Sequence, residues 1–96
     1  MLKEWYESNV QNLRDRGFVL NFSGKESDGV VHSSAVDLDS RDRLGRLTIW
    51  EGGAAHLQVL EVSSGAVLVD EHREMSGRVG FEDAVSSLVA HVSHCG

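Results

Sequence analysis

The chain contains no proline and a single cysteine, Cys95, among its 96 residues. One cysteine cannot form an internal disulfide, which excludes a cross-linked secreted scaffold and favours a reducing compartment, the cytoplasm. The absence of proline is compatible with regular elements joined by short turns. No linker or repeat divides the sequence, so we expect a single domain over residues 1–96.

Long apolar runs and an excess of positive charge are also missing. No stretch approaches the roughly 20 apolar residues of a membrane span, and the N-terminal segment MLKEWYESN lacks the apolar core of a signal peptide. Fifteen acidic residues against nine basic ones give a formal net charge of −6, the opposite of the balance expected for a nucleic-acid-binding domain. We therefore expect neither a membrane nor a nucleic acid as partner. An acidic domain is better suited to a basic protein partner.

The spacing of apolar residues predicts an α+β fold. The predicted elements are a helix over residues 2–16, strands over 18–23, 30–38, 44–51, 56–62 and from 66 onward, and a helix over 80–94. Short connections between the strands favour a five-stranded antiparallel meander, flanked by the N-terminal and C-terminal helices on one face. Trp5 and Tyr6 are expected to pack the first helix onto the sheet, and Trp50 to anchor the central strand, at least half buried.

Glycines and polar residues mark the ends of these elements. Gly17 is expected to cap the first helix. Gly52-Gly53 and Ser63-Ser64-Gly65 are typical of hairpin turns, which need residues that tolerate positive φ. Residues 24–29 and 76–80 are predicted loops, which puts Glu82 and Asp83 in the first turn of the last helix, where acidic side chains favour the helix dipole.

The histidines raise the question of a metal site. His32, His56 and His72 lie on three different predicted strands and could meet on one face of the sheet, which the sequence leaves open. A second group shares one face of the last helix near its end: His91, His94 and Cys95. A helix end does not hold ligands rigidly. We therefore predict no bound metal and no cofactor.

No catalytic motif is present. The serines lie in turns and polar loops, and neither a nucleophile elbow nor a phosphate-binding glycine pattern occurs. Glu71 and His72 are adjacent, but neighbours on a strand point to opposite faces. We expect a protein that is not an enzyme. A small hydrolase using histidines and carboxylates, and a non-catalytic ligand-binding or assembly module, are the alternatives.

Carboxylates gather on the predicted strands and the connections between them. Their ordinary role is to solvate a sheet face, and their functional role would be an anionic patch that docks a cationic partner. The candidate binding residues are Asp37, Asp39, Trp50, Glu51, Asp70, Glu71 and Glu74, with Tyr6 as a second aromatic anchor.

Several segments between residues 36 and 76 resemble a known family. They are VDLDS at 36–40, LGRLTIWEGG at 44–53, LQVLEV at 57–62, Ser64-Gly65 and EHREMS at 71–76. In these segments the chain is similar to small immunity proteins of bacterial polymorphic-toxin systems of the contact-dependent inhibition type, and nearest to the TriTu-like group. The flanking helices match this family in placement.

The resemblance implies a cognate antitoxin with no substrate and no turnover. Such a protein binds the toxic C-terminal domain of an effector delivered by a sibling cell, and blocks its active site or a surface needed for target binding. The resemblance itself assigns no binding residue. A nuclease is the toxin that the acidic composition favours, because a nuclease cleft must attract phosphate; the oligomeric state is left open.

Overall fold

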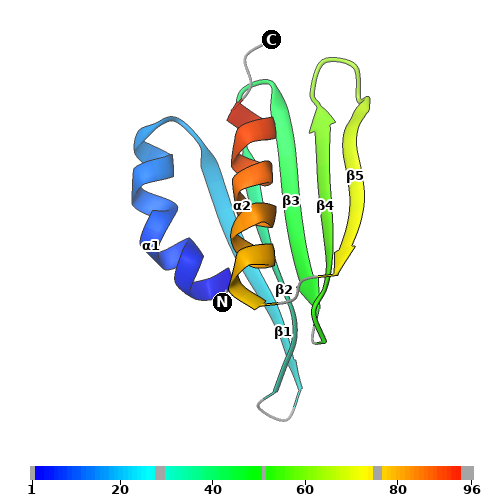
Figure 1. Cartoon of the computed structure of the whole chain (residues 1–96). Coiled ribbons are helices and arrows are strands. Elements are labelled where there is room, and N and C mark those ends of the chain that lie inside the picture. Colours follow the sequence, from blue (N-terminus) through cyan, green and yellow to red (C-terminus); the bar gives the residue numbers. More distant parts are fainter. Residues whose placement is uncertain (1, 28–29, 51, 75–76, 94–96) are drawn as a thin grey trace.

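A computed structural model describes residues 2–27, 30–50, 52–74 and 77–93, with backbone alone for 25–27, 30–32, 77 and 78. The elements in chain order are α1 (Leu2–Asp15), β1 (Val19–Ser27), β2 (Val30–Asp39), β3 (Arg43–Trp50), β4 (Ala54–Glu61), β5 (Val67–Glu74) and α2 (Gly77–Ser93). The five strands pair antiparallel in the order β1-β2-β3-β4-β5. Figure 1 shows both helices on one face of this sheet. The predicted α+β class, meander and flanking helices are confirmed.

The helices cover different parts of that face. α1 contacts β1 and β2, whereas α2 contacts β2, β3 and β4. β5 lies at the sheet edge beyond α2 (Figure 1). None of the helices in the described ranges is long and apolar enough to cross a bilayer.

The end of α1 is set by Gly17, as predicted. Gly17 has φ of 95°, a conformation that glycine adopts without a steric penalty. Its N–H donates to the carbonyl of Arg14 at 3.0 Å, and the N–H of Phe18 donates to that of Leu13, also at 3.0 Å. This pair of bonds is the Schellman motif, and the accompanying apolar contact comes from Leu13 and Phe18, which are both buried. The chain therefore turns directly from α1 into β1.

The core lies between the helices and the sheet. Alternate residues of the central strands are fully buried, among them Val36, Leu47 and Leu57, each 0% exposed, because successive strand side chains point to opposite faces. α2 contributes a stripe of buried residues at helical spacing: Phe81, Ala84, Val85, Leu88 and Val92. Trp5, Tyr6 and Val10 of α1 pack against this core while partly buried, which confirms the predicted role of the two aromatics.

Two predicted boundaries are wrong. β1 continues to Ser27, through the residues predicted as a polar loop, with a register shift between Lys25 and Glu26. Strand pairing uses backbone groups, so polar side chains do not end a hairpin ladder. α2 begins at Gly77 and has no acidic residue in its first turn, so Glu82 and Asp83 lie further along the helix than predicted. Glycine has a low helix propensity. Packing of the apolar stripe on the sheet overrides this low propensity at the N-terminal start of α2.

Gly45 allows α2 to lie directly on β3. A Cβ atom at this position would be 2.5 Å from Cγ2 of Val92 and 2.7 Å from Cδ1 of Leu88. Both distances are far shorter than a van der Waals contact between carbons. The strand presents bare backbone to the helix here, and the two side chains of α2 fill the space that a larger residue would take.

We predict that Gly45→Ala lowers the free energy of unfolding by about 1–3 kcal/mol, because the added methyl overpacks the contact between α2 and β3. Urea denaturation followed by circular dichroism measures the change. Gly24→Ala is the matched control, because its added Cβ would lie 3.7 Å from the nearest atom, the carbonyl oxygen of Ser33. Equal stability of Gly45→Ala and the parent would contradict the close packing described.

Candidate functional site

The face of the sheet opposite the helices carries most of the predicted binding residues. Residues that alternate with the buried ones must point to this side, and we call it the open face. Its members on β1 to β5 include Val19, Asn21, Asp37, Asp39, Leu44, Arg46, Thr48, Trp50, His56, Gln58, Leu60, Asp70, His72 and Glu74. The register of the strands decides which of them are neighbours.

One row across the open face is polar from edge to edge. Antiparallel pairing aligns Asn21, Asp37, Arg46, Gln58 and Asp70. In the middle of the row Arg46 donates two hydrogen bonds to the Asp37 carboxylate, from Nε to Oδ1 at 2.6 Å and from Nη2 to Oδ2 at 3.2 Å. The hydrogen bond to Asp37 and the negative charge of that carboxylate raise the pKa of the Arg46 guanidinium. Because Arg46 is exposed, the pair orients the two groups more than it stabilises the fold.

A shallow hollow opens beside this ion pair. Its volume is about 350 Å³, and its lining residues are Asp37, Asp39, Leu44, Gly45, Arg46, Gln58 and Leu60. Partial burial and, next, the charge of Asp37 raise the pKa of Asp39, while a hydrogen bond from the backbone N–H of Gly45 partly offsets the rise. The hollow thus combines apolar walls with a carboxylate whose charged form is disfavoured by its surroundings.

Large apolar side chains are exposed at both ends of β3. Leu44 is 42% exposed and Trp50 is 41% exposed. Trp50 is therefore more than half covered, as predicted, but it lies on the open face and not in the core. A partly covered tryptophan on a polar sheet face is the kind of residue that anchors protein interfaces.

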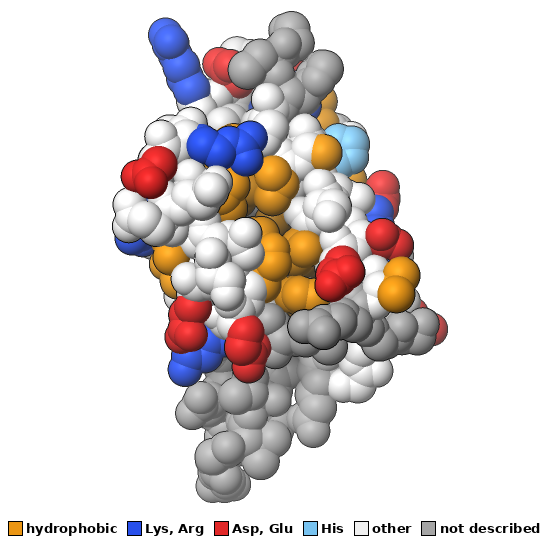
Figure 2. Space-filling model, turned by 60° about the vertical axis from the view of Figure 1, so that its left-hand side comes forward, with side chains coloured by type: hydrophobic (Ala, Val, Ile, Leu, Met, Phe, Trp, Pro, Cys, Tyr) orange, Lys and Arg blue, Asp and Glu red, His pale blue; other side chains and the backbone are white. Residues whose placement is uncertain are grey.

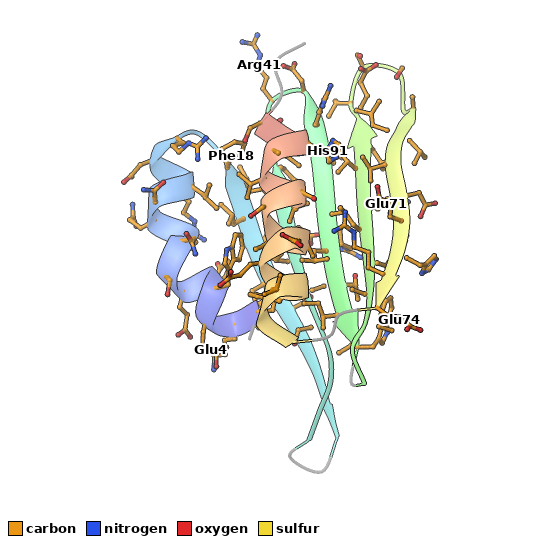
Figure 3. The ribbon with its side chains drawn as sticks, viewed as in Figure 1. Glu4, Phe18, Arg41, Glu71, Glu74 and His91 are labelled. Atoms are coloured by element: carbon orange, nitrogen blue, oxygen red, sulfur yellow. The ribbon has the colours of Figure 1, made fainter. Side chains whose placement is uncertain are left out.

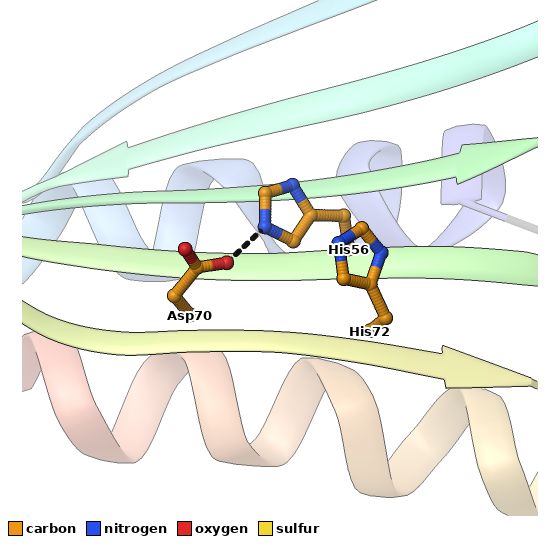
Figure 4. A group of neighbouring side chains, drawn as sticks. All are labelled: His56, Asp70 and His72. Atoms are coloured by element: carbon orange, nitrogen blue, oxygen red, sulfur yellow. Dashed lines mark hydrogen bonds and ion pairs between the residues drawn. The ribbon is translucent and has the colours of Figure 1, made fainter.

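A group of three side chains lies on β4 and β5 (Figure 4). His56 and His72 are partners in the strand register, and their rings stack with centroids 4.5 Å apart and an interplanar angle of 8°. Nε2 of His56 lies 2.5 Å from Oδ1 of Asp70. The sequence left open whether histidines from different strands meet, and the register answers this for His56 and His72. The side chain of His32 lies outside the described residues.

The predicted site residues do not all share the open face. Asp37, Asp39, Trp50, Asp70 and Glu74 do. Glu71 pairs with Leu57, which is buried under the helices. Its side chain therefore lies on the helix side, where Arg73 donates to it from Nε at 3.1 Å and Nη2 at 2.9 Å.

Figure 3 shows Glu71 and Glu74 along the edge strand β5. Tyr6 is also on the helix side, with its ring 5.6 Å from that of Phe22. Glu51, His94 and Cys95 lie outside the described residues. His91 is exposed on α2, and its backbone carbonyl accepts a hydrogen bond from Nη1 of Arg43 at 2.7 Å.

Two residues of the open face were missed as site residues: Leu44 and Arg46. Each has an ordinary appearance in the sequence, within a strand of alternating polar and apolar residues. The signal that could have found them is the pairing register, which follows from the tight turn at Gly52-Gly53 once the strand ends are known. Sequence spacing alone does not fix those ends.

A second hollow of about 480 Å³ lies between α1 and α2, on the helix side. Figure 2 shows hydrophobic side chains gathered in the middle of this side. The residues that line this second hollow include Trp5, Leu13, Val85 and Val89, together with the charged Arg16. None of the described residues that line this hollow is a carboxylate, so the open face is the better match to the acidic character of the chain.

We predict that Asp39→Asn raises the free energy of unfolding at pH 7. The pKa of Asp39 is raised above its ordinary value of 3.8 in the folded protein, so the folded state binds the proton more tightly than the unfolded state. Protonated Asp39 therefore contributes stability that is fully present below pH 3.8. This contribution is lost as pH rises through the folded-state pKa. The stabilisation by Asp39→Asn should disappear in that acidic range. Denaturation at a series of pH values measures it, with the exposed Asp42→Asn as the control for net charge. A gain that is independent of pH would contradict the prediction.

Comparison with known proteins extends the resemblance to the whole domain. A family model described as Immunity protein TriTu matches residues 1–91. A search of the curated proteins gave no match. The matched segment includes α1, all five strands and most of α2, and not only the residues between 36 and 76. The chain therefore belongs to the TriTu family of immunity proteins.

Proposed function

We propose that the chain neutralises its partner toxin by direct contact through the open face, in the cytoplasm of the cell that makes it. Membership of an immunity-protein family supports an antitoxin role with a toxin protein as partner. The observation that carries the choice of surface is the charge of the open face. Among the residues whose side chains the structure describes, Asp37, Asp39, Asp70 and Glu74 give this face four carboxylates, and Arg46 gives it one guanidinium.

The partner that this charge fits is a toxin with a basic cleft, most simply a nuclease. A nuclease must bind phosphates, so lysine and arginine line its active site. Carboxylates facing such a cleft attract it over a long range and oppose the binding of nucleic acid. Asp37 is ion-paired with Arg46, and Asp70 lies against His56. The charge of Arg46 offsets that of Asp37, so Asp39, Asp70 and Glu74 are the carboxylates that remain to face a partner's cations.

The open face also has the size and the anchors that an interface needs. Strands β3, β4 and β5 have eight residues each, so the five-stranded face measures roughly 25 Å in each direction. That is of the order of the roughly 800 Å² that each partner buries in a standard complex. Trp50 and Leu44 lie at opposite ends of β3 and would fill apolar pockets of the partner.

We propose binding, and not turnover, as the activity. Among the described residues, His56, Asp70 and His72 form a group of catalytic side-chain types on the open face, and the Asp70 side chain in it is 53% exposed. Acid–base and nucleophilic catalysis gain most of their strength in a site that excludes water. An exposed sheet surface is suited to contact a macromolecule.

The charge model predicts salt-dependent association with the cognate toxin domain. Between about 50 and 500 mM salt the Debye length shrinks from about 14 to about 4 Å, and the association rate should fall by about tenfold or more. Asp70→Lys and Glu74→Lys should each slow association at low salt. Glu71→Lys is the matched control, because it makes the same change on the same strand but on the helix side.

Stopped-flow mixing of the purified partners measures these rates. Electrostatic docking would be refuted if the association rate changed neither with salt concentration nor in the Asp70→Lys and Glu74→Lys variants. Equal slowing by Glu71→Lys would instead show that net charge matters and that the open face does not.

Trp50→Ala should weaken toxin binding by about 2 kcal/mol or more, which is roughly 30-fold in dissociation constant. The reason is that an aromatic anchor loses its buried contacts with the partner. Calorimetric titration measures the affinity, and Val79→Ala, at an exposed apolar residue of α2, is the control. Unchanged affinity of a folded Trp50→Ala variant would remove Trp50 from the interface.

A further inference from the structure

The two histidines on β4 and β5 are held at a distance that suits a shared ligand. His56 and His72 are directly paired across adjacent antiparallel strands, where partner Cβ atoms lie about 4.5–5.5 Å apart. Their rings stack with centroids at 4.5 Å. The backbone ladder fixes this spacing, so neither histidine needs a mobile segment to reach the other.

Asp70 adds a third donor from the same face. It lies two residues before His72 on β5 and pairs with Gln58, next to His56 in the sheet. Its Oδ1 is already 2.5 Å from Nε2 of His56 (Figure 4). One nitrogen from each histidine and one oxygen of Asp70 all lie within 4.8 Å of one another.

Two imidazoles and a carboxylate are a ligand set for a divalent transition metal. Zinc binds histidine nitrogen and carboxylate oxygen at about 2.0–2.2 Å, so ligand atoms around a tetrahedral ion lie about 3.4 Å apart. The present spread is 4.8 Å or less. Rotation of the side chains closes the difference, and the Asp70 side chain at 53% exposed has room to rotate. The ion would take the place of the proton shared between His56 and Asp70.

We propose that His56, Asp70 and His72 form a binding site for a divalent transition metal ion of the zinc type, with the remaining coordination position open to solvent. Imidazole ligands favour zinc, copper and nickel over magnesium and calcium. The metal site shares Asp70 with the proposed toxin-binding face, but its test uses Zn²⁺ without any toxin, so either proposal can fail without the other. It differs from the sequence-based expectation of no metal, because the pairing register brings together residues that lie 14 and 16 positions apart.

The test uses untagged full-length protein and Zn²⁺ as the probe. Equilibrium dialysis with elemental analysis should find one zinc per chain. When Zn²⁺ is titrated into the Co²⁺-loaded protein, zinc should displace the cobalt, and the visible absorption of bound Co²⁺ should be lost in step. His56→Ala and His72→Ala should each abolish stoichiometric binding at the concentration that saturates the parent. His91→Ala, at an exposed histidine of α2, should bind as the parent does.

Nuclear magnetic resonance of the parent keeps the test valid if a variant fails to fold. Zn²⁺ should shift the imidazole signals of His56 and His72 together and leave that of His91 in place. The proposal is overturned if the parent binds no zinc, if binding survives in folded His56→Ala and His72→Ala variants, or if the zinc-dependent shifts fall on His91.

Discussion

The contact between α2 and β3 at Gly45 is the constraint on which the rest of the structure depends. Leu88 and Val92 occupy the space that a side chain at position 45 would need, so the helix lies on the middle of the sheet and not over its edge. The fully buried residues of β2, β3 and β4 are those that face this helix. Because the described chain provides two helices for five strands, and both pack on one face, the second face of the sheet stays polar.

That division explains one of the segments that resemble the immunity-protein family. In the run LGRLTIW, Gly45, Leu47 and Ile49 point toward the helices, while Arg46 and Trp50 belong to the open face. Residues of this strand therefore alternate between those that pack against the helices and those that face the open side of the sheet. The glycine belongs to the packing of α2. The arginine and the tryptophan are available to a partner.

The open face is organised by cross-strand pairs. Asp37 and Arg46 are partners in the register, as are His56 and His72, and the two pairs occupy neighbouring rows of the sheet. Opposite charges placed directly across two strands attract, and like charges repel. The carboxylate of Asp39 has no such cation opposite it, since its partner on β3 is Leu44, and partial burial beside Asp37 raises its pKa. The acidic face is therefore not a uniform layer of solvated charge, and its members differ in how readily they can meet a cation.

The sequence by itself determined the α+β class, the meander, the two hairpin turns and the cap at Gly17, because these follow from local periodicity and from backbone conformations that glycine favours. It also supplied the carboxylates and Trp50 as candidate binding residues, which remains a prediction. What it could not determine was which of these residues lie together. Alternation along β5 separates Glu71 from Glu74 but does not say which of them lies on the helix side, and His56 meets His72 across two adjacent strands. The start of α2 at Gly77 likewise came from packing and against local preference. Side-chain alternation has a period of two, so a shift of one residue in register would exchange the two faces, and only the tertiary structure fixes that register by burying one set of side chains under the helices.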